Sequence, residues 1–262
     1  MIVSFPPPVP GSVPPAASGP ASAPAENATD PAENAADPTE NAANPTEHAA
    51  DPTATPLGFG VGARVSAAVM ADDYASLLRG ILSRLDDTGL VRETGDVSTY
   101  VGGHEAHLQR YLIDLAEDLA RTEHHATISV LLSRGCPGEV ACELPGGAGP
   151  RGVEVPEPRR TGRYASAEWA LYPLADQVLA DGTLPDHMRD IYAAIDHARE
   201  LGTFRGSEHF VTRLEGDVGD VLATAIAGWL LVGRSVQHVT SHLTISLNSP
   251  SHATRTLDEV TR

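Results

Sequence analysis

Two histidines at helical spacing are the first residues whose types could do chemistry. His104 and His107 stand three positions apart in a segment of helical periodicity, and His124 and His125 follow it. Imidazoles at positions i and i+3 share one helix face and could bind a metal ion. No carboxylate partner or third ligand stands at motif spacing, so solvated surface histidines are the favoured interpretation and we expect no metal site.

Other catalytic patterns fail on spacing or context. Cys136 and Cys142 have five residues between them rather than the two of a zinc or redox pair. The glycine-rich run 58–62 precedes a predicted strand instead of joining a strand to a helix, so it is no dinucleotide fingerprint. No nucleophile elbow, His-Glu-x-x-His helix or phosphate loop is present in the sequence. We therefore expect a non-enzymatic protein without a cofactor.

The charge balance limits the classes of molecule that the protein can be expected to bind. The 262 residues hold 35 acidic and 18 basic residues, for a net charge of −17, and every basic residue is arginine. The absence of lysine excludes Schiff-base, P-loop and kinase-type lysine chemistry. An acidic chain without a basic stripe does not suit nucleic acid or an anionic membrane surface, and it favours a cationic small ligand.

The N-terminal segment differs in composition from the rest. Residues 1–57 hold 13 of the 21 prolines, no arginine and a seven-residue repeat whose copies start at Glu26, Glu33, Glu40 and Glu47. A proline in every copy argues against a coiled coil. The segment predicts a disordered acidic tail; a binding role, or a true start further downstream, stays open. It lacks the features of a secretory signal, and no apolar run is long enough to span a membrane, so we expect a cytoplasmic protein.

The folded part reads as alternating helices and strands. Helical periodicity runs from Asp72 or Asp73 to Gly89, through Leu108–Leu119, through Met188–Ile195 and through Val218–Trp229. The stretch between Leu90 and Gly103 predicts two strands joined by a turn at Gly95-Asp96.

An internal duplication organises these elements. Residues 63–72 align with 167–176, 97–103 with 210–216, and 127–129 with 244–246. Each half then has the order strand, helix, strand, strand, helix, strand. This predicts an α+β protein of two tandem ferredoxin-like repeats. The predicted segments are a tail (1–57), a first repeat (58–138), a linker (139–163), a second repeat (164–252) and a C-terminal tail (253–262).

The last strand alternates between apolar and polar residues. Leu243, Ile245 and Leu247 point one way, and Thr244 and Ser246 point the other. Helices cover only one face of such a sheet, so a semi-polar open face occurs in each repeat. We expect this face to pack against another domain or subunit, most simply in a homodimer.

Seven short segments, in order along both halves, carry a resemblance to a known family. Those of the first half are Gly62–Ser66, Met70–Tyr74, Asp96–Thr99 and Ser133–Gly138. Those of the second half are Ala170–Leu174, Thr212–Val218 and Ile245–Pro250. In these segments the sequence resembles the YkoF family of thiamine- and hydroxymethylpyrimidine-binding proteins. The chain departs from the family pattern at Ala67-Ala68-Val69, where Leu-Tyr-Pro is usual, whereas Leu171-Tyr172-Pro173 keeps it.

The resemblance implies a dimeric binding protein with one small-ligand pocket per repeat. It also implies a role in the uptake or salvage of thiamine precursors, in which transporter components are the partners. An aminopyrimidine and a thiazolium cation need a carboxylate, hydroxyls and an aromatic or acidic surface. The matched segments supply these types, and the predicted ligand-binding residues are Ser66, Asp96, Ser98, Thr99, Ser133, Cys136, Tyr172, Thr212, Arg213, Asp217, Asn248 and Ser249.

Several of these residues also have purely structural interpretations. Thr99 and Thr212 suit any strand, and Asp96 suits any turn. Asp217 suits a helix N-cap, and Arg213 could pair with Glu215 or Asp217. Cys136 could be a small buried hydrophobe. A regulatory or structural module that senses a different ligand is the alternative function, because fold alone does not fix function.

Overall fold

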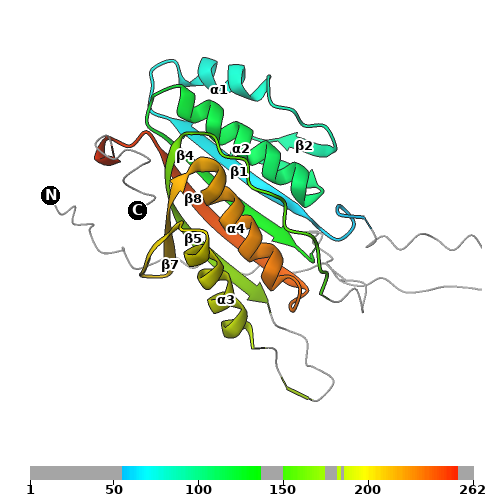
Figure 1. The fold of residues 1–262 in the computed structure, drawn as a ribbon. Helices are drawn as coiled ribbons and strands as arrows, with labels where there is room; N and C mark the ends of the chain where they lie inside the picture. Colours follow the sequence, from blue (N-terminus) through cyan, green and yellow to red (C-terminus); the bar gives the residue numbers. More distant parts are fainter. Residues whose placement is uncertain (1–54, 137–149, 175–181, 184–185, 253–262) are drawn as a thin grey trace, which may run out of the picture. The chain divides into compact units, whose positions relative to one another are not determined.

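A computed structural model of the protein describes residues 55–136, 150–174, 182–183 and 186–252 (Figure 1). Nearly all of the predicted N-terminal tail, the predicted C-terminal tail and Cys142 lie outside the described residues.

Each half of the chain has the predicted order of elements. The first half consists of β1 (Gly62–Val69), α1 (Tyr74–Leu82), β2 (Leu90–Thr94), β3 (Thr99–Gly103), α2 (Glu105–Arg121) and β4 (Ala126–Arg134). The second half consists of β5 (Tyr164–Leu174), α3 (His187–Glu200), β6 (Phe204–Glu208), β7 (Val211–Asp217), α4 (Val218–Val232) and β8 (His238–Leu247), followed by the short 3-10 helix η2 (Pro250–His252).

The eight strands form one antiparallel sheet in the order β2-β3-β1-β4-β8-β5-β7-β6. Each half has the split-βαβ arrangement, in which a third strand lies between two strands that a helix connects. In the first half β3 lies between β1 and β2, and in the second half β7 lies between β5 and β6. The halves meet where β4 pairs with β8 over nine residues on each strand. One continuous sheet therefore carries both repeats.

Backbone geometry at the start of the second helix fixes which residues of the two halves correspond. Gly103 and Gly216 have φ values of 150° and 149°, in the region that favours glycine. His104 and Asp217 follow them as N-caps of α2 and α4, and both side chains accept a hydrogen bond from the amide two residues on.

Strand pairing then aligns the two halves along the sheet. Thr99 lies opposite Val65 and Thr212 opposite Trp169, so Val65 corresponds to Trp169. By the same reasoning Val130 corresponds to Leu243. The predicted match of 127–129 with 244–246 is wrong by four residues: these segments are hydrogen-bonded neighbours, in which Ile128 lies opposite Ile245. Similar sequences on paired strands mimicked a repeat.

All four helices lie on one face of the sheet (Figure 1). The alternation predicted for β8 is confirmed, with Leu243, Ile245 and Leu247 fully buried. The opposite face is left open by the helices. It carries polar side chains and large exposed hydrophobic ones, namely Val91, Leu131, Tyr172 and Leu174.

A fully buried arginine lies near the start of α2. Arg134 donates from Nη2 to the carbonyl of Arg151 at 2.8 Å. The same nitrogen lies 3.9 Å from Oε1 of Glu105, which is also buried. The guanidinium stacks over the rings of Phe59 and Trp229, at 5.5 and 5.8 Å from their centroids. Burial lowers the pKa of this guanidinium, and the charge of Glu105 opposes that shift.

The described part of the connector, residues 150–163, is bound to α2 of the first half. Gln109 on α2 donates to the carbonyl of Glu157 at 2.8 Å. Arg159 pairs with Asp114 at 2.6 Å and with Glu117 at 2.7 Å, also on α2. The connector therefore lies along α2 as a strap before it enters β5.

Among the described residues, no helix combines the length and the apolarity needed to cross a membrane.

Candidate functional site

A small hollow opens in the first repeat where β3 stops short of β1. The pairing of β1 with β3 ends at Val65 and Thr99, while β1 continues to Val69. In the described residues the β3-facing backbone edge of β1 therefore has no strand partner after Val65. The turn between β2 and β3 folds over this notch, and Ser66 donates from its hydroxyl to the Val97 carbonyl at 3.0 Å.

Four of the predicted ligand-binding residues meet at this hollow. Ser66 lines it from β1, and Asp96, Ser98 and Thr99 line it from the turn and the start of β3. The hydroxyl of Thr99 also lies 3.2 Å from that of Thr94. Residues with hydroxyl and carboxyl side chains thus line a cavity of about 130 Å³ beside the unpaired edge of β1.

Apolar side chains from both helices complete this cavity. Leu78 and Leu82 come from α1, and Tyr111 and Leu115 come from α2. These residues were predicted only as helix core, because a pocket floor and a core face share the same helical spacing. Their position against the polar turn is what identifies them as lining residues.

The corresponding place in the second repeat is nearly filled. Thr212 is buried there among Trp169, Leu171, Ile191 and Ile195, and the described side chains leave about 30 Å³. Trp169 occupies the position that Val65 has in the first repeat. Its indole nitrogen donates to the hydroxyl of Ser241 at 2.9 Å, which fixes the ring. Thr212 is thus the only predicted ligand residue among those that line this smaller space.

Three predicted residues lie on or beside the sheet away from both hollows. Ser133 is paired with Gly62, at the other end of β1 from Ser66. Cys136 follows the end of β4 and is partly buried. Tyr172 is half exposed, opposite Thr240 on the open face of the sheet. These residues belong to segments that match the family, but the direction of their strands places them away from both hollows.

Two further predicted residues follow the C-terminal end of β8. Asn248 adopts a left-handed conformation (φ 51°) and donates from Nδ2 to the carbonyls of Ala120 and His124, at 2.9 and 3.0 Å. The hydroxyl of Ser249 lies 2.8 Å from that of Ser251. Asn248 therefore connects the end of the second repeat to the end of α2.

The charged pair of the second repeat has the structural roles that the sequence left open. Arg213 pairs with Glu208 at 3.0 Å and with Glu215 at 2.5 Å. Asp217 is buried and accepts hydrogen bonds from the amides of Gly219 (2.8 Å), Thr161 (2.9 Å) and Gly162 (2.6 Å). The N-cap interpretation of Asp217 and the pairing of Arg213 with Glu215 are confirmed.

Because Asp217 ties the connector to α4, its loss should be costly. We expect Asp217→Ala to lower the free energy of unfolding by about 2–3 kcal/mol, through lost capping and unsatisfied buried amides. The matched control is Asp186→Ala at the N-cap of α3, whose side chain makes one exposed bond, to the Arg189 amide at 3.1 Å. That change should cost about 1 kcal/mol or less. Equal losses in urea melts of the two variants would show that the connector bonds of Asp217 add nothing.

The comparisons with known proteins agree with this arrangement. The model of the YKOF-related family matches residues 60–139 and 164–252. The chain is similar to the "Putative HMP/thiamine-binding protein YkoF" of Bacillus subtilis (strain 168), at 29% identity over 194 residues, which cover 74% of this chain and 93% of the relative. Since the two matched regions together make up more than half of the sequence, the chain belongs to the YKOF-related family.

Proposed function

We propose that the protein binds thiamine or its hydroxymethylpyrimidine (HMP) moiety, without chemical turnover, in the hollow of the first repeat. The observation that carries this proposal is the meeting of Ser66, Asp96, Ser98 and Thr99 at one apolar-floored hollow. The printed name of the Bacillus relative supports the same ligand class.

The size of the hollow suits one heteroaromatic ring. A cavity of about 150 Å³ holds a benzene molecule, and this one measures about 130 Å³. An aminopyrimidine would place its ring against Leu78, Leu82 and Tyr111. Its ring nitrogens and amine would reach the hydroxyls, the Asp96 carboxylate and the free edge of β1. The thiazolium of thiamine would then lie at the mouth of the hollow.

The net charge of −17 favours such a cationic end. Exposed charges act over a screening length of about 8 Å at physiological salt, so this attraction is weak and falls further as salt is added. The ring and its hydrogen bonds would supply specificity, and the acidic surface would supply long-range attraction.

Titration of the purified full chain with thiamine and, separately, with HMP tests this function. We expect saturable heat with at least one of them and a matching rise in melting temperature. A stoichiometry of one per chain fits a ligand in the hollow of the first repeat, and two would require the corresponding place in the second repeat to open. Absence of both heat and a thermal shift with either ligand would overturn the proposal.

We also propose that each half is a ferredoxin-like repeat and that two chains form a homodimer through the open faces of their sheets. The split-βαβ strand order supports the first point. The one-sided helix layer and the exposed Leu131, Tyr172 and Leu174 support the second. Uptake or salvage of thiamine precursors, with transporter components as partners, is the biological role we propose for this binding; neighbouring transporter genes would favour it.

A charge at the middle of the open face should separate the proposed dimer. Leu131 lies between Arg64 on β1 and His242 on β8. We expect Leu131→Glu to convert a dimer into a monomer in light scattering or analytical ultracentrifugation, because burying two carboxylates at one interface is unfavourable. Val97→Glu, at a still more exposed apolar side chain in the turn between β2 and β3, should leave the dimer intact. A wild-type monomer at micromolar concentration would rule the dimer out.

A further inference from the structure

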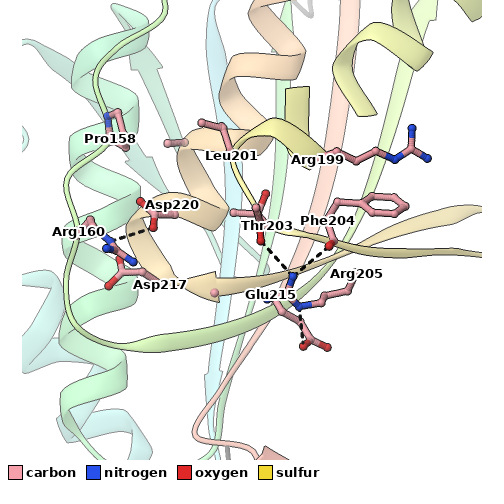
Figure 2. A pocket seen from close by; sticks show the side chains of 13 residues that line it. Pro158, Arg160, Arg199, Leu201, Thr203, Phe204, Arg205, Glu215, Asp217 and Asp220 are labelled. Atoms are coloured by element: carbon pink, nitrogen blue, oxygen red, sulfur yellow. Dashed lines mark hydrogen bonds and ion pairs between the residues drawn. The ribbon is translucent and has the colours of Figure 1, made fainter. Parts of the chain in front are cut away.

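A hollow larger than that of the first repeat lies apart from both ligand positions considered above. It has a volume of about 570 Å³, a size typical of small-molecule sites. The connector forms one wall, and the end of α3, the turn into β6, the end of β7 and the first turns of α4 form the others (Figure 2). Its apolar lining comes from Pro158, Leu201, Phe204 and Ala223.

Comparison of the repeats shows what opens this hollow. Counting from the N-caps, Asp220 and Ala223 on α4 correspond to His107 and Arg110 on α2. In the first repeat, His107 Nδ1 lies 3.4 Å from the carbonyl of Gly89, and Arg110 donates to the carbonyl of Thr88 at 2.9 Å. Those long side chains reach the loop before β2. The shorter Asp220 and Ala223 leave the equivalent space open in the second repeat.

Three guanidinium groups and three carboxylates line the hollow. Arg160 pairs with Asp220 at 3.0 Å, and Arg205 lies 3.6 Å from Glu215 (Figure 2). Arg199 stacks over the Phe204 ring at 4.5 Å from its centroid. The formal charges of the lining therefore cancel, and accessibility decides which sign a ligand meets.

The most exposed charged side chains of the lining are cationic. The side chains of Arg160 and Arg199 are 62% and 54% exposed, whereas that of Glu215 is 2% exposed. Asp217 is buried and already accepts amide hydrogen bonds from the connector and from α4. Burial raises the pKa of Asp220, and the positive charge of its ion-pair partner Arg160 opposes that shift. A ligand in the hollow thus meets the exposed guanidinium groups of Arg160 and Arg199 before the buried carboxylates. Arg160 is paired with Asp220 and Arg199 with Asp196 at 2.5 Å, so an anion would compete with or bridge these pairs.

We propose that this hollow binds a small organic anion, a carboxylate or phosphate carried on a planar apolar group. The planar group would lie against Leu201, Phe204 and Pro158, and the anion would lie between the guanidinium groups of Arg160 and Arg199. Arginine suits this role because its planar fork of donors matches the oxygens of both anions. This site is independent of the thiamine-related site in the first repeat.

Shape-matched probes test the proposal on the full chain. Benzoate and phenyl phosphate are titrated beside neutral benzamide and cationic benzylammonium, with binding followed by calorimetry. We expect at least one anion to bind at one site per chain, about tenfold or more tighter than the neutral and cationic probes. Affinity should fall with added salt. The stronger anion identifies the preferred group; equal binding of all four probes, or none, overturns the proposal.

Variants place the binding in this hollow. Arg160→Gln should weaken the anion about tenfold, and Ala223→Arg, which copies the first repeat's Arg110, should abolish binding by filling the space. The matched control is Arg84→Gln, which is 63% exposed and paired with Asp118 in the first repeat; it should bind as the wild type does. Because Arg160 is exposed, its variant keeps the test valid even if Ala223→Arg fails to fold. Wild-type affinity in Arg160→Gln would overturn the assignment, while its thiamine titration should stay unchanged.

Discussion

Asp96→Asn should weaken the binding of HMP about ten- to hundredfold. Asp96 is the carboxylate among the polar residues that line the hollow of the first repeat. A hydrogen bond from a ligand amine to a charged acceptor contributes about 1.5–3 kcal/mol, which corresponds to that range. The backbone of the turn should survive the change, because its closing bond joins the Gly95 amide to the Ser98 carbonyl at 3.0 Å.

Asp73→Asn is the matched control for this change. Asp73 is an exposed acid of the same repeat, at the N-cap of α1, and its side chain makes no capping hydrogen bond. It removes the same charge and should leave the affinity within about twofold, since exposed charges are screened. Calorimetric titrations of both variants with HMP decide the matter. Equal affinities for Asp96→Asn and wild type would make Asp96 a turn residue only.

Arg134→Met should lower the free energy of unfolding by about 3–5 kcal/mol. The change removes the hydrogen bond to the Arg151 carbonyl and leaves the buried carboxylate of Glu105 without its cation. Methionine fills much of the same volume, so the loss reports the uncompensated charge more than a cavity. Urea melts at neutral pH measure it.

The double variant Glu105→Gln with Arg134→Met separates charge from packing. Removing both charges should recover much of the loss, because an apolar or neutral replacement of a whole buried ion pair is often close to neutral. The two residues interact directly, so their effects should be clearly non-additive. Additive losses in this cycle would show that Arg134 stabilises the fold by stacking on Phe59 and Trp229 instead.

Local patterns predicted most elements of the fold. The helical spacing around Leu112 and Leu222 places α2 and α4, and the turn residues Gly95-Asp96 place the hairpin of β2 and β3. These signals depend only on neighbouring residues, so the sequence holds them. Strand register does not work this way: the pairing of Val130 with Leu243 joins residues more than a hundred positions apart in the sequence.

The candidate site was predictable in part for the same reason. Ser66, Asp96, Ser98 and Thr99 meet because one hairpin folds over one strand end. The contacts of Asn248 with Ala120 and His124 join residues 128 and 124 positions apart, so no local sequence pattern predicts them. Likewise, Trp169 looks like any strand residue until pairing shows that it stands where Val65 leaves room.

The pairing of β4 with β8 makes the chain a covalently linked pair of like units. Val130 and Leu243 correspond to each other and are also directly opposite each other, so a local two-fold axis runs through this pair. The two halves thus join along one strand edge, as two copies of a single repeat do in a two-fold dimer, but within one chain. This junction leaves β2 and β6 as the outermost strands of the described sheet, each of five residues and each carrying both an arginine and a glutamate. Short charged edges resist further strand addition, so growth of the sheet stops at eight strands.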